Sequence, residues 1–141
     1  MNSSKFTTLF LLISLLYISC NNTPGLPPDK VGEQAVRHLI NLEFDEASAL
    51  STEESLFNLN LVKSGIILAK AASNKFDSVL IDLRQSTIES KILSEKNDSA
   101  WVSVNFRNSK NFKSESGIKL LLLKRSNKWF VNFDSNFLFA Q

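Results

Sequence analysis

The sequence predicts an α+β fold, in which helices of the first half pack on one antiparallel sheet of about four strands formed by the second half. Apolar residues recur every three or four positions between residues 31 and 72, which is the spacing of amphipathic helices. After Ser73 and Asn74 the spacing changes to two, as in half-buried strands. Helices followed by a run of strands are the element order of an α+β domain.

Three helices are expected in the first half. The first runs from Lys30 to Leu42, and Asp29 is a suitable N-cap because its carboxylate can accept bonds from free backbone N–H groups. A short second helix begins at Glu43. Ser51 and Glu54 have the spacing of a capping box, and a third helix is expected from Thr52 to Ala72. Its apolar breadth predicts burial against the sheet.

The first two strand segments follow. The stretch from Phe76 to Leu93 is interpreted as strand with a break near Gln85 or Ser86, because apolar residues occupy alternate positions at 79, 81 and 83. A polar turn at residues 95–98 ends it. The next strand, residues 100–106, alternates clearly, and it places on one face Ala100, Val102, Val104 and Phe106, and on the other Trp101, Ser103 and Asn105.

Two more strands complete the expected sheet. A polar loop over residues 108–117 leads to the strand Ile118–Leu123, which is apolar on both faces and is therefore expected to be central or covered by helices. Ser126 and Asn127 form a tight turn. The last strand, residues 128–134, has on one face Trp129, Val131 and Phe133, and Phe137 and Phe139 follow it.

The first twenty residues predict export. Lys5 precedes an uncharged, mostly apolar run from Phe6 to Ile18, which is too short to span a bilayer comfortably and is typical of a secretory signal. The run ends at Ser19 and Cys20, the only cysteine of the chain. An exported chain with one cysteine forms no internal disulfide, so an unmodified Cys20 would be a reactive thiol. The alternative interpretations are an ordinary secretory signal that is cut near a free cysteine and a short helix that is buried in the fold.

The segment Leu16-Tyr17-Ile18-Ser19-Cys20 resembles the lipobox of bacterial lipoproteins, although Leu16 is one place further from the cysteine than in the commonest pattern. The resemblance implies a diacylglycerol on Cys20, cleavage after Ser19 and acylation of the new amine by a fatty acid such as palmitate. Two or more acyl chains make a stable anchor, because each buried methylene contributes roughly 0.8 kcal/mol. The expected location is the bacterial cell envelope, anchored to a membrane and facing the periplasm.

The expected organisation is a signal peptide (1–19), a flexible tether rich in polar residues, Gly and Pro (20–28), and a single α+β domain (29–141). Loss of Lys5 with the signal leaves 15 basic and 14 acidic residues. The basic residues concentrate in the second half, where they are interpreted as a solvated strand face rather than a nucleic-acid site. Contact of this patch with anionic lipid or another envelope component remains a weaker alternative.

The segments Val36–Ala47, Asn97–Val104 and Leu122–Trp129 are together similar to small bacterial lipoprotein domains of the nuclear-transport-factor-like, or cystatin-like, superfamily. The resemblance covers most of the chain after the tether. It implies a strongly curved sheet that wraps a long helix into a cone, often with a pocket at the open end. Many such lipoprotein domains have no assigned activity. The glycine usual before the Lys-Trp pair is Asn127 here, which also tolerates left-handed backbone angles.

Candidate catalytic residues are few. Some enzymes of this superfamily abstract a proton beside a carbonyl with a pocket carboxylate and hydroxyl donors. The one tyrosine, Tyr17, leaves with the signal, and Asp82, Glu89 and Asp134, which the strand assignment places on strands, are each expected to face water. His38, the only histidine, is interpreted as a boundary residue of the first helix rather than part of a triad. No catalytic residue is assigned.

Metal and cofactor sites are not expected either. No His, Cys or carboxylate cluster has ligand spacing, and no glycine-rich phosphate loop is present. Trp101 and Trp129 are expected to pack in the core or under a helix, with a ligand pocket as the alternative.

The function predicted from these observations is that of an anchored domain that binds another envelope protein or a small apolar ligand. A pocket enzyme of the isomerase or dehydratase type is one alternative, and a purely structural interaction domain is another. An apolar cavity would favour ligand binding, whereas a buried pocket carboxylate with a raised pKa would favour an enzyme.

Overall fold

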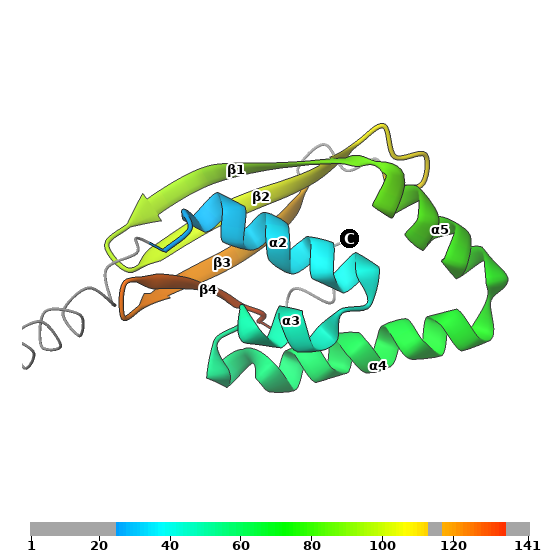
Figure 1. Cartoon of the computed structure of the whole chain (residues 1–141), viewed down its shortest axis with the longest axis horizontal. Helices are drawn as coiled ribbons and strands as arrows, with labels where there is room; N and C mark the ends of the chain where they lie inside the picture. The colour runs from blue at the N-terminus through cyan, green and yellow to red at the C-terminus, as the bar shows by residue number, and fades with distance from the viewer. Residues whose placement is uncertain (1–24, 113–116, 135–141) are drawn as a thin grey trace, which may run out of the picture.

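The computed structural model describes residues 25–112 and 117–134 and confirms an α+β arrangement, with helices packed against a four-stranded antiparallel sheet (Figure 1). The strands follow one another in chain order, β1-β2-β3-β4, and the sheet is open, with β1 and β4 at its edges. The elements are α2 (Pro28–Asn41), α3 (Phe44–Ala49), the 3-10 turn η1 (Glu53–Ser55), α4 (Leu56–Ala72), α5 (Asn74–Gln85), β1 (Thr87–Lys96), β2 (Ser99–Arg107), β3 (Ile118–Arg125) and β4 (Lys128–Asn132).

Helix α2 lies across one face of the sheet (Figure 1). The helix lies close to the sheet at Gly32, where an added Cβ would lie 3.3 Å from Val102 and 3.4 Å from Leu120. The predicted N-cap is wrong: the helix begins at Pro28, with Pro27 at the N-cap, and Asp29 lies in the first turn. Proline is favoured there because its missing N–H would have no partner in the first turn. The Asp29 carboxylate still complements the positive end of the helix dipole.

The C-terminus of α2 is closed by a leucine in a left-handed conformation. Leu42 has φ 65°, and its N–H donates to the carbonyl of Leu39. The Glu43 N–H donates to the carbonyl of His38 at 2.8 Å, which completes a Schellman motif. Leucine is strained in this region, where glycine is usual, so the packing of α2 and α3 outweighs the local preference.

The expected capping box at Ser51 is also wrong. The Ser51 hydroxyl donates back to the carbonyl of Ala47 at 2.6 Å, and the turn η1 intervenes before α4 without a side-chain cap. The backbone here pairs with the sheet instead, because the Thr52 N–H donates to the Val131 carbonyl and the Val131 N–H donates to the Leu50 carbonyl. Residues 50–52 therefore protect part of the exposed edge of β4.

The third predicted helix exists over η1 and α4, but the expectation that it is buried against the sheet is wrong. Helix α4 packs mainly on α3 and α5 rather than across the sheet (Figure 1), although the Asn58 side-chain amide donates to the Phe133 carbonyl, just after β4, at 2.8 Å. Only Leu59 and Val62 of α4 are buried. The opposite side is open to solvent, with Phe57 70 % and Leu68 69 % exposed.

The largest error concerns residues 74–85, which form helix α5 instead of a strand. Val79 and Leu83 fit an alternating pattern, but they also fit a helical stripe with Phe76 and Leu80, and the helical period is the one that buries them. Ser73 caps α5 by accepting a bond from the Lys75 N–H at 3.2 Å. The predicted break near Gln85 or Ser86 is confirmed, since β1 begins at Thr87.

The last three strands lie where they were predicted, although β4 ends at Asn132 and not at residue 134. The inward residues of β2 are buried, as are Leu120 and Leu122 of β3, which lies between β2 and β4. Trp129, Val131 and Phe133 are also buried. Ser126 and Asn127 both have positive φ, 48° and 63°, which matches the primed turns of short hairpins. Cys20, Phe137 and Phe139 lie outside the described residues.

Candidate functional site

An apolar hollow of about 190 Å³ lies where α2, α4, α5 and β3 meet. All of its lining residues are apolar, and they are Val36, Leu39, Ile40, Val62, Ile66, Phe76, Val79, Leu80, Leu83 and Ile118. We call this hollow the apolar pocket. Its volume lies below the usual range for drug-sized ligands but above that of an engineered cavity that holds benzene. The pocket therefore has room for one phenyl ring or a short hydrocarbon chain.

The local sequence explains why the pocket exists. Helix α5 turns the side chains at positions 76, 79, 80 and 83 toward α2, which is the i, i+3, i+4, i+7 stripe of a helix. Helix α4 contributes the lining residues Val62 and Ile66. The far end of α5 is tied to α2 by Arg84, whose Nε donates to the Ile40 carbonyl at 2.8 Å. This site was not predicted from the sequence, because residues 74–85 were interpreted as a strand.

Asp82 lies on α5, not on a strand, and its side chain is bound by the loop that follows β2. Its carboxylate accepts bonds from the Ser109 hydroxyl at 2.7 Å, from the backbone N–H groups of Lys110 and Asn111, and from the Asn111 side-chain amide. These bonds, led by that from Ser109, lower the pKa of Asp82 to about 2. A carboxylate held ionised in this way anchors a loop and is a weak general base.

Asp82 also borders a second hollow of about 370 Å³, whose lining is largely polar and includes Ser78, Gln85, Asn108 and Lys110. The hollow lies between α5 and the loop after β2, and Ile81 on its wall is 51 % exposed. This second hollow and the apolar pocket have no lining residue in common.

The other two candidate carboxylates also lie outside the apolar pocket. Glu89, on β1, forms an ion pair of 2.5 Å with Arg107 on β2, and both side chains are substantially exposed. Asp134 follows β4 and is half-buried. Asp82, Glu89 and Asp134 are thus absent from the pocket lining, and within the described residues they do not gather with one another as a group of three.

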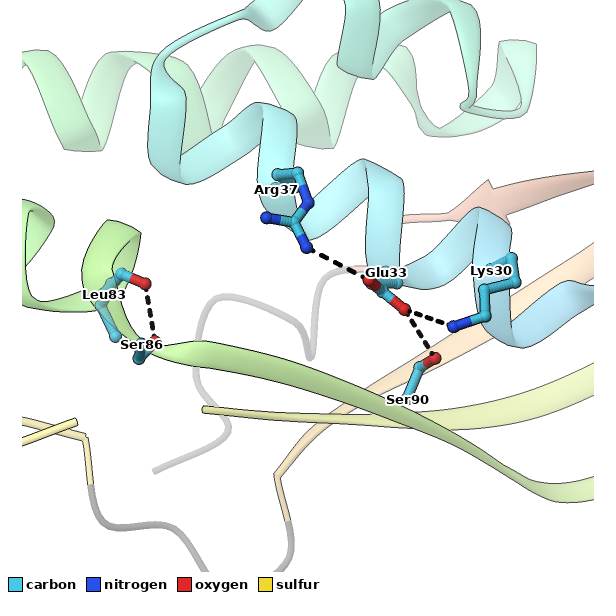
Figure 2. A network of polar contacts seen from close by, with 6 residues as sticks. All are labelled: Lys30, Glu33, Arg37, Leu83, Ser86 and Ser90. Atoms are coloured by element: carbon cyan, nitrogen blue, oxygen red, sulfur yellow. Dashed lines mark hydrogen bonds and ion pairs between the residues drawn. The ribbon is translucent and has the colours of Figure 1, made fainter. Parts of the chain in front are cut away.

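Glu33 is the most connected carboxylate of the helix–sheet contact (Figure 2). It accepts bonds from Lys30 at 2.9 Å and Arg37 at 3.2 Å on α2, and from the Ser90 hydroxyl on β1 at 3.2 Å. Burial acts to raise the pKa of Glu33, but these three donors outweigh it and the pKa is lowered. The contact fixes α2 against the edge strand β1.

His38 occupies the boundary position predicted for it. Its Nδ1 lies 2.6 Å from the Glu43 carboxylate, and the side chain is 28 % exposed near the C-terminus of α2. The pair joins α2 to the start of α3. His38 is not among the lining residues of the apolar pocket.

The two tryptophans differ. Trp129 is buried as predicted, and the Lys124 ammonium lies 5.5 Å from the centre of its ring. Trp101 is 42 % exposed on the sheet face opposite α2, so the expectation that it packs in the core or under a helix is wrong. Neither ring lines the apolar pocket.

No group of three or more His, Cys, Asp or Glu side chains gathers at a metal-binding distance within residues 25–112 and 117–134. In the same residues no helix has both the length and the hydropathy needed to cross a bilayer. No family model matches the chain, and neither a curated protein nor a solved structure does.

Proposed function

We propose that this chain is an envelope lipoprotein, anchored through Cys20 and facing the periplasm, whose domain binds a small apolar group in the apolar pocket. The carrying observation is the pocket itself, since ten apolar side chains from four elements line a hollow that has room for benzene. Support for the anchor comes from the residues before Cys20, which resemble a lipobox.

The lining favours binding over catalysis. Abstraction of a proton beside a carbonyl needs a base within hydrogen-bond reach of the substrate, and no carboxylate, histidine or hydroxyl is among the pocket-lining residues. Asp82, the most perturbed carboxylate among the described residues, has a lowered pKa rather than the raised one such a base needs. An isomerase or dehydratase is therefore the less supported alternative.

Membership of the nuclear-transport-factor-like, or cystatin-like, superfamily remains part of this proposal. The helices on one face of an antiparallel sheet and the closing hairpin at Ser126 and Asn127 are compatible with it. One feature departs from the implied cone: the helix that crosses the sheet is α2, whereas the longest described helix, α4, lies outside.

Benzene tests the pocket. We expect benzene to raise the Tm of the native chain, because a ligand that binds only the folded state stabilises it. Val79→Phe places a ring in the pocket and is expected to remove this shift, and Ile66→Phe does the same from the opposite wall. Ile81→Phe is the matched control, since Ile81 is on α5 outside the pocket lining. An equal shift in all three variants, or none in the native chain, would contradict the proposal.

The anchor has its own test. Cells that express the native chain are labelled with a radioactive fatty acid and compared with cells that express Cys20→Ala. Label is expected in the native chain alone. Equal labelling of the two chains would refute a lipid on Cys20.

A second candidate function, binding of a protein partner, is favoured by the exposed side of α4. Phe57, Leu61 and Leu68 lie at i, i+4 and i+11 on one stripe of the helix and are 44–70 % exposed. A photo-crosslinking residue at position 68 is expected to capture a partner in intact cells. The same residue at position 75 on α5 is the control, and capture at neither position would contradict this candidate.

A further inference from the structure

The outer face of the sheet, opposite α2, carries an apolar cluster near the two hairpin turns. Strand register places Trp101 beside Leu121, and Leu123 beside Phe130, on this face. Trp101 is 42 % exposed and the other three side chains are half-buried. No described helix covers the cluster, because α2 packs on the inner face (Figure 1).

Exposed basic residues surround this cluster. The same register puts Lys91 and Lys119 on either side of Ser103, in the row before Trp101. Toward the hairpin turns, Lys96 lies opposite Ser99, and Arg125 lies opposite Lys128. We define the basic aromatic face as this set of nine residues: Trp101, Leu121, Leu123 and Phe130 with Lys91, Lys96, Lys119, Arg125 and Lys128.

Carboxylates also lie near these residues. Two of them are exposed at the β1–β2 hairpin, where the register places Glu95 beside Ala100 on the opposite face and Asp98 lies in the turn. Glu89 stands further along the face, where Arg107 neutralises it. Glu53 and Glu54 lie beyond the β4 edge, in a hollow that Arg125 and Phe130 also line. Away from the hairpin turns, the same face is partly covered by the chain at Gly117. An added Cβ on Gly117 would lie only 2.6 Å from the Ser103 hydroxyl. The basic aromatic face is therefore a positive, partly apolar surface next to the hairpin turns.

The start of the described chain lies at the same end of the sheet. An added Cβ on Gly25 would lie 3.0 Å from the Asn127 carbonyl oxygen and 3.4 Å from the Lys128 Cα. Cys20 is five residues earlier in the sequence. Five extended residues span at most about 17 Å, so a lipid on Cys20 would hold the hairpin end of the sheet close to the membrane.

We propose that the basic aromatic face lies on an anionic lipid surface, with Trp101 in the interfacial region and the lysines against the headgroups. Tryptophan is enriched at membrane interfaces, and clustered lysines and arginines are attracted to anionic lipids. This inference rests on the proposed function, which supplies the membrane through Cys20. It places the apolar pocket on the far side of the sheet, facing away from the bilayer.

The first experiment uses the acylated chain in vesicles of phosphatidylglycerol and brominated phosphatidylcholine. Trp129→Phe leaves Trp101 as the only tryptophan of the chain. The brominated lipid is expected to quench the Trp101 fluorescence strongly. This quenching should be lost in a double variant that carries both Lys119→Glu and Lys128→Glu. Lys75→Glu, an exposed change on α5, is the matched control and is expected to leave the quenching unchanged. An acylated chain whose Trp101 is not quenched would overturn the proposal.

The second experiment separates the surface from the anchor. A chain that begins at residue 20, carries Cys20→Ala and keeps every described residue is sedimented with phosphatidylglycerol vesicles. Salt-sensitive binding is expected. Reversal of the charge at Lys119 should weaken it roughly thirtyfold, since each charge near the surface contributes a factor of about five to six and a reversal counts as two charges. Trp101→Ser should also weaken it, whereas the exposed α4 variant Phe57→Ser should not.

The outcomes are distinguishable. Binding of this unacylated chain to the vesicles together with an unlabelled Cys20 would refute the anchor and leave the surface standing. A labelled Cys20 without vesicle binding would refute the surface and leave the anchor standing. Binding of an acidic protein or of nucleic acid at the same residues, without binding to vesicles, would also overturn the proposal.

Discussion

Arg84 on α5 donates a hydrogen bond from its Nε to the backbone carbonyl of Ile40 on α2, at 2.8 Å, although the two residues are 44 positions apart in the sequence. The bond closes one end of the apolar pocket, because Ile40 and Leu83 both line it. It also satisfies a carbonyl in the last turn of α2, where backbone acceptors lack partners within the helix. The pocket thus depends on how α5 is held against α2.

Arg84→Met is expected to lower the free energy of unfolding by about 1–2 kcal/mol, because a charge-assisted hydrogen bond is lost. Urea denaturation measures the change. Lys75→Met on the same helix is the control, with an expected effect within about 0.5 kcal/mol, as is usual for surface substitutions. Equal effects of the two substitutions would show that the bond to Ile40 contributes nothing.

Substitution of the two helical glycines by alanine is expected to change the stability of the fold in opposite directions. Gly65 in α4 has nothing within 4 Å of an added Cβ, so Gly65→Ala should stabilise the fold by about 0.5–1 kcal/mol. Gly32 in α2 lies against Val102 and Leu120, so Gly32→Ala should lose this gain through overpacking. Thermal unfolding of both variants measures the difference. A similar gain at both positions would contradict the close approach of α2 to the sheet.

The left-handed residue at the end of α2 gives a third prediction. Leu42→Gly and Leu42→Ala both remove the leucine side chain, but only glycine relieves the strain at φ 65°. The glycine variant should therefore be about 1 kcal/mol more stable than the alanine variant. If the alanine variant proved the more stable in urea denaturation, the Schellman motif assigned here would be wrong.

Asp82 predicts a dependence of stability on pH. Its pKa is about 2 in the folded chain, against an ordinary value of 3.8, so the folded state binds its proton less readily than the unfolded state. Its contribution is complete above pH 3.8 and is lost as the pH falls through 2. The stability difference between the native chain and Asp82→Asn should therefore shrink over this interval. A difference that stays constant down to pH 2 would exclude the loop contact as its source.

The sequence predicted α2, β2 and β4 because each has one unambiguous period, and it predicted β3 because a short apolar run bounded by turn residues is typical of a central strand. In β2, for example, Val102 and Val104 point inward and Trp101 points outward, and no helical stripe fits these residues equally well. The turn at Ser126 and Asn127 was predictable for a similar reason, because such polar residues accept the conformations that a tight hairpin needs.

Helix α5 was not predictable in the same way. Val79 and Leu83 fit periods of two and of nearly four, so local pattern alone did not decide between strand and helix. The helical stripe that these two residues form with Phe76 and Leu80 was the evidence for a helix in the sequence. Because this stripe lines the apolar pocket, the pocket was not predicted either. The exposure of one side of α4 could not be predicted from the local sequence pattern. Many apolar residues around a helix indicate that it packs on another surface, but they do not show which surface that is.

A crystal structure determined under xenon pressure would show whether the apolar pocket admits an apolar guest. Xenon enters apolar cavities of this size. A xenon peak is expected in van der Waals contact with Val36, Ile66 and Val79, and no such peak is expected in Val79→Phe. A native crystal without xenon between α2, α4 and α5, or with that space filled by the protein's own side chains, would contradict the proposal that the pocket receives an apolar group.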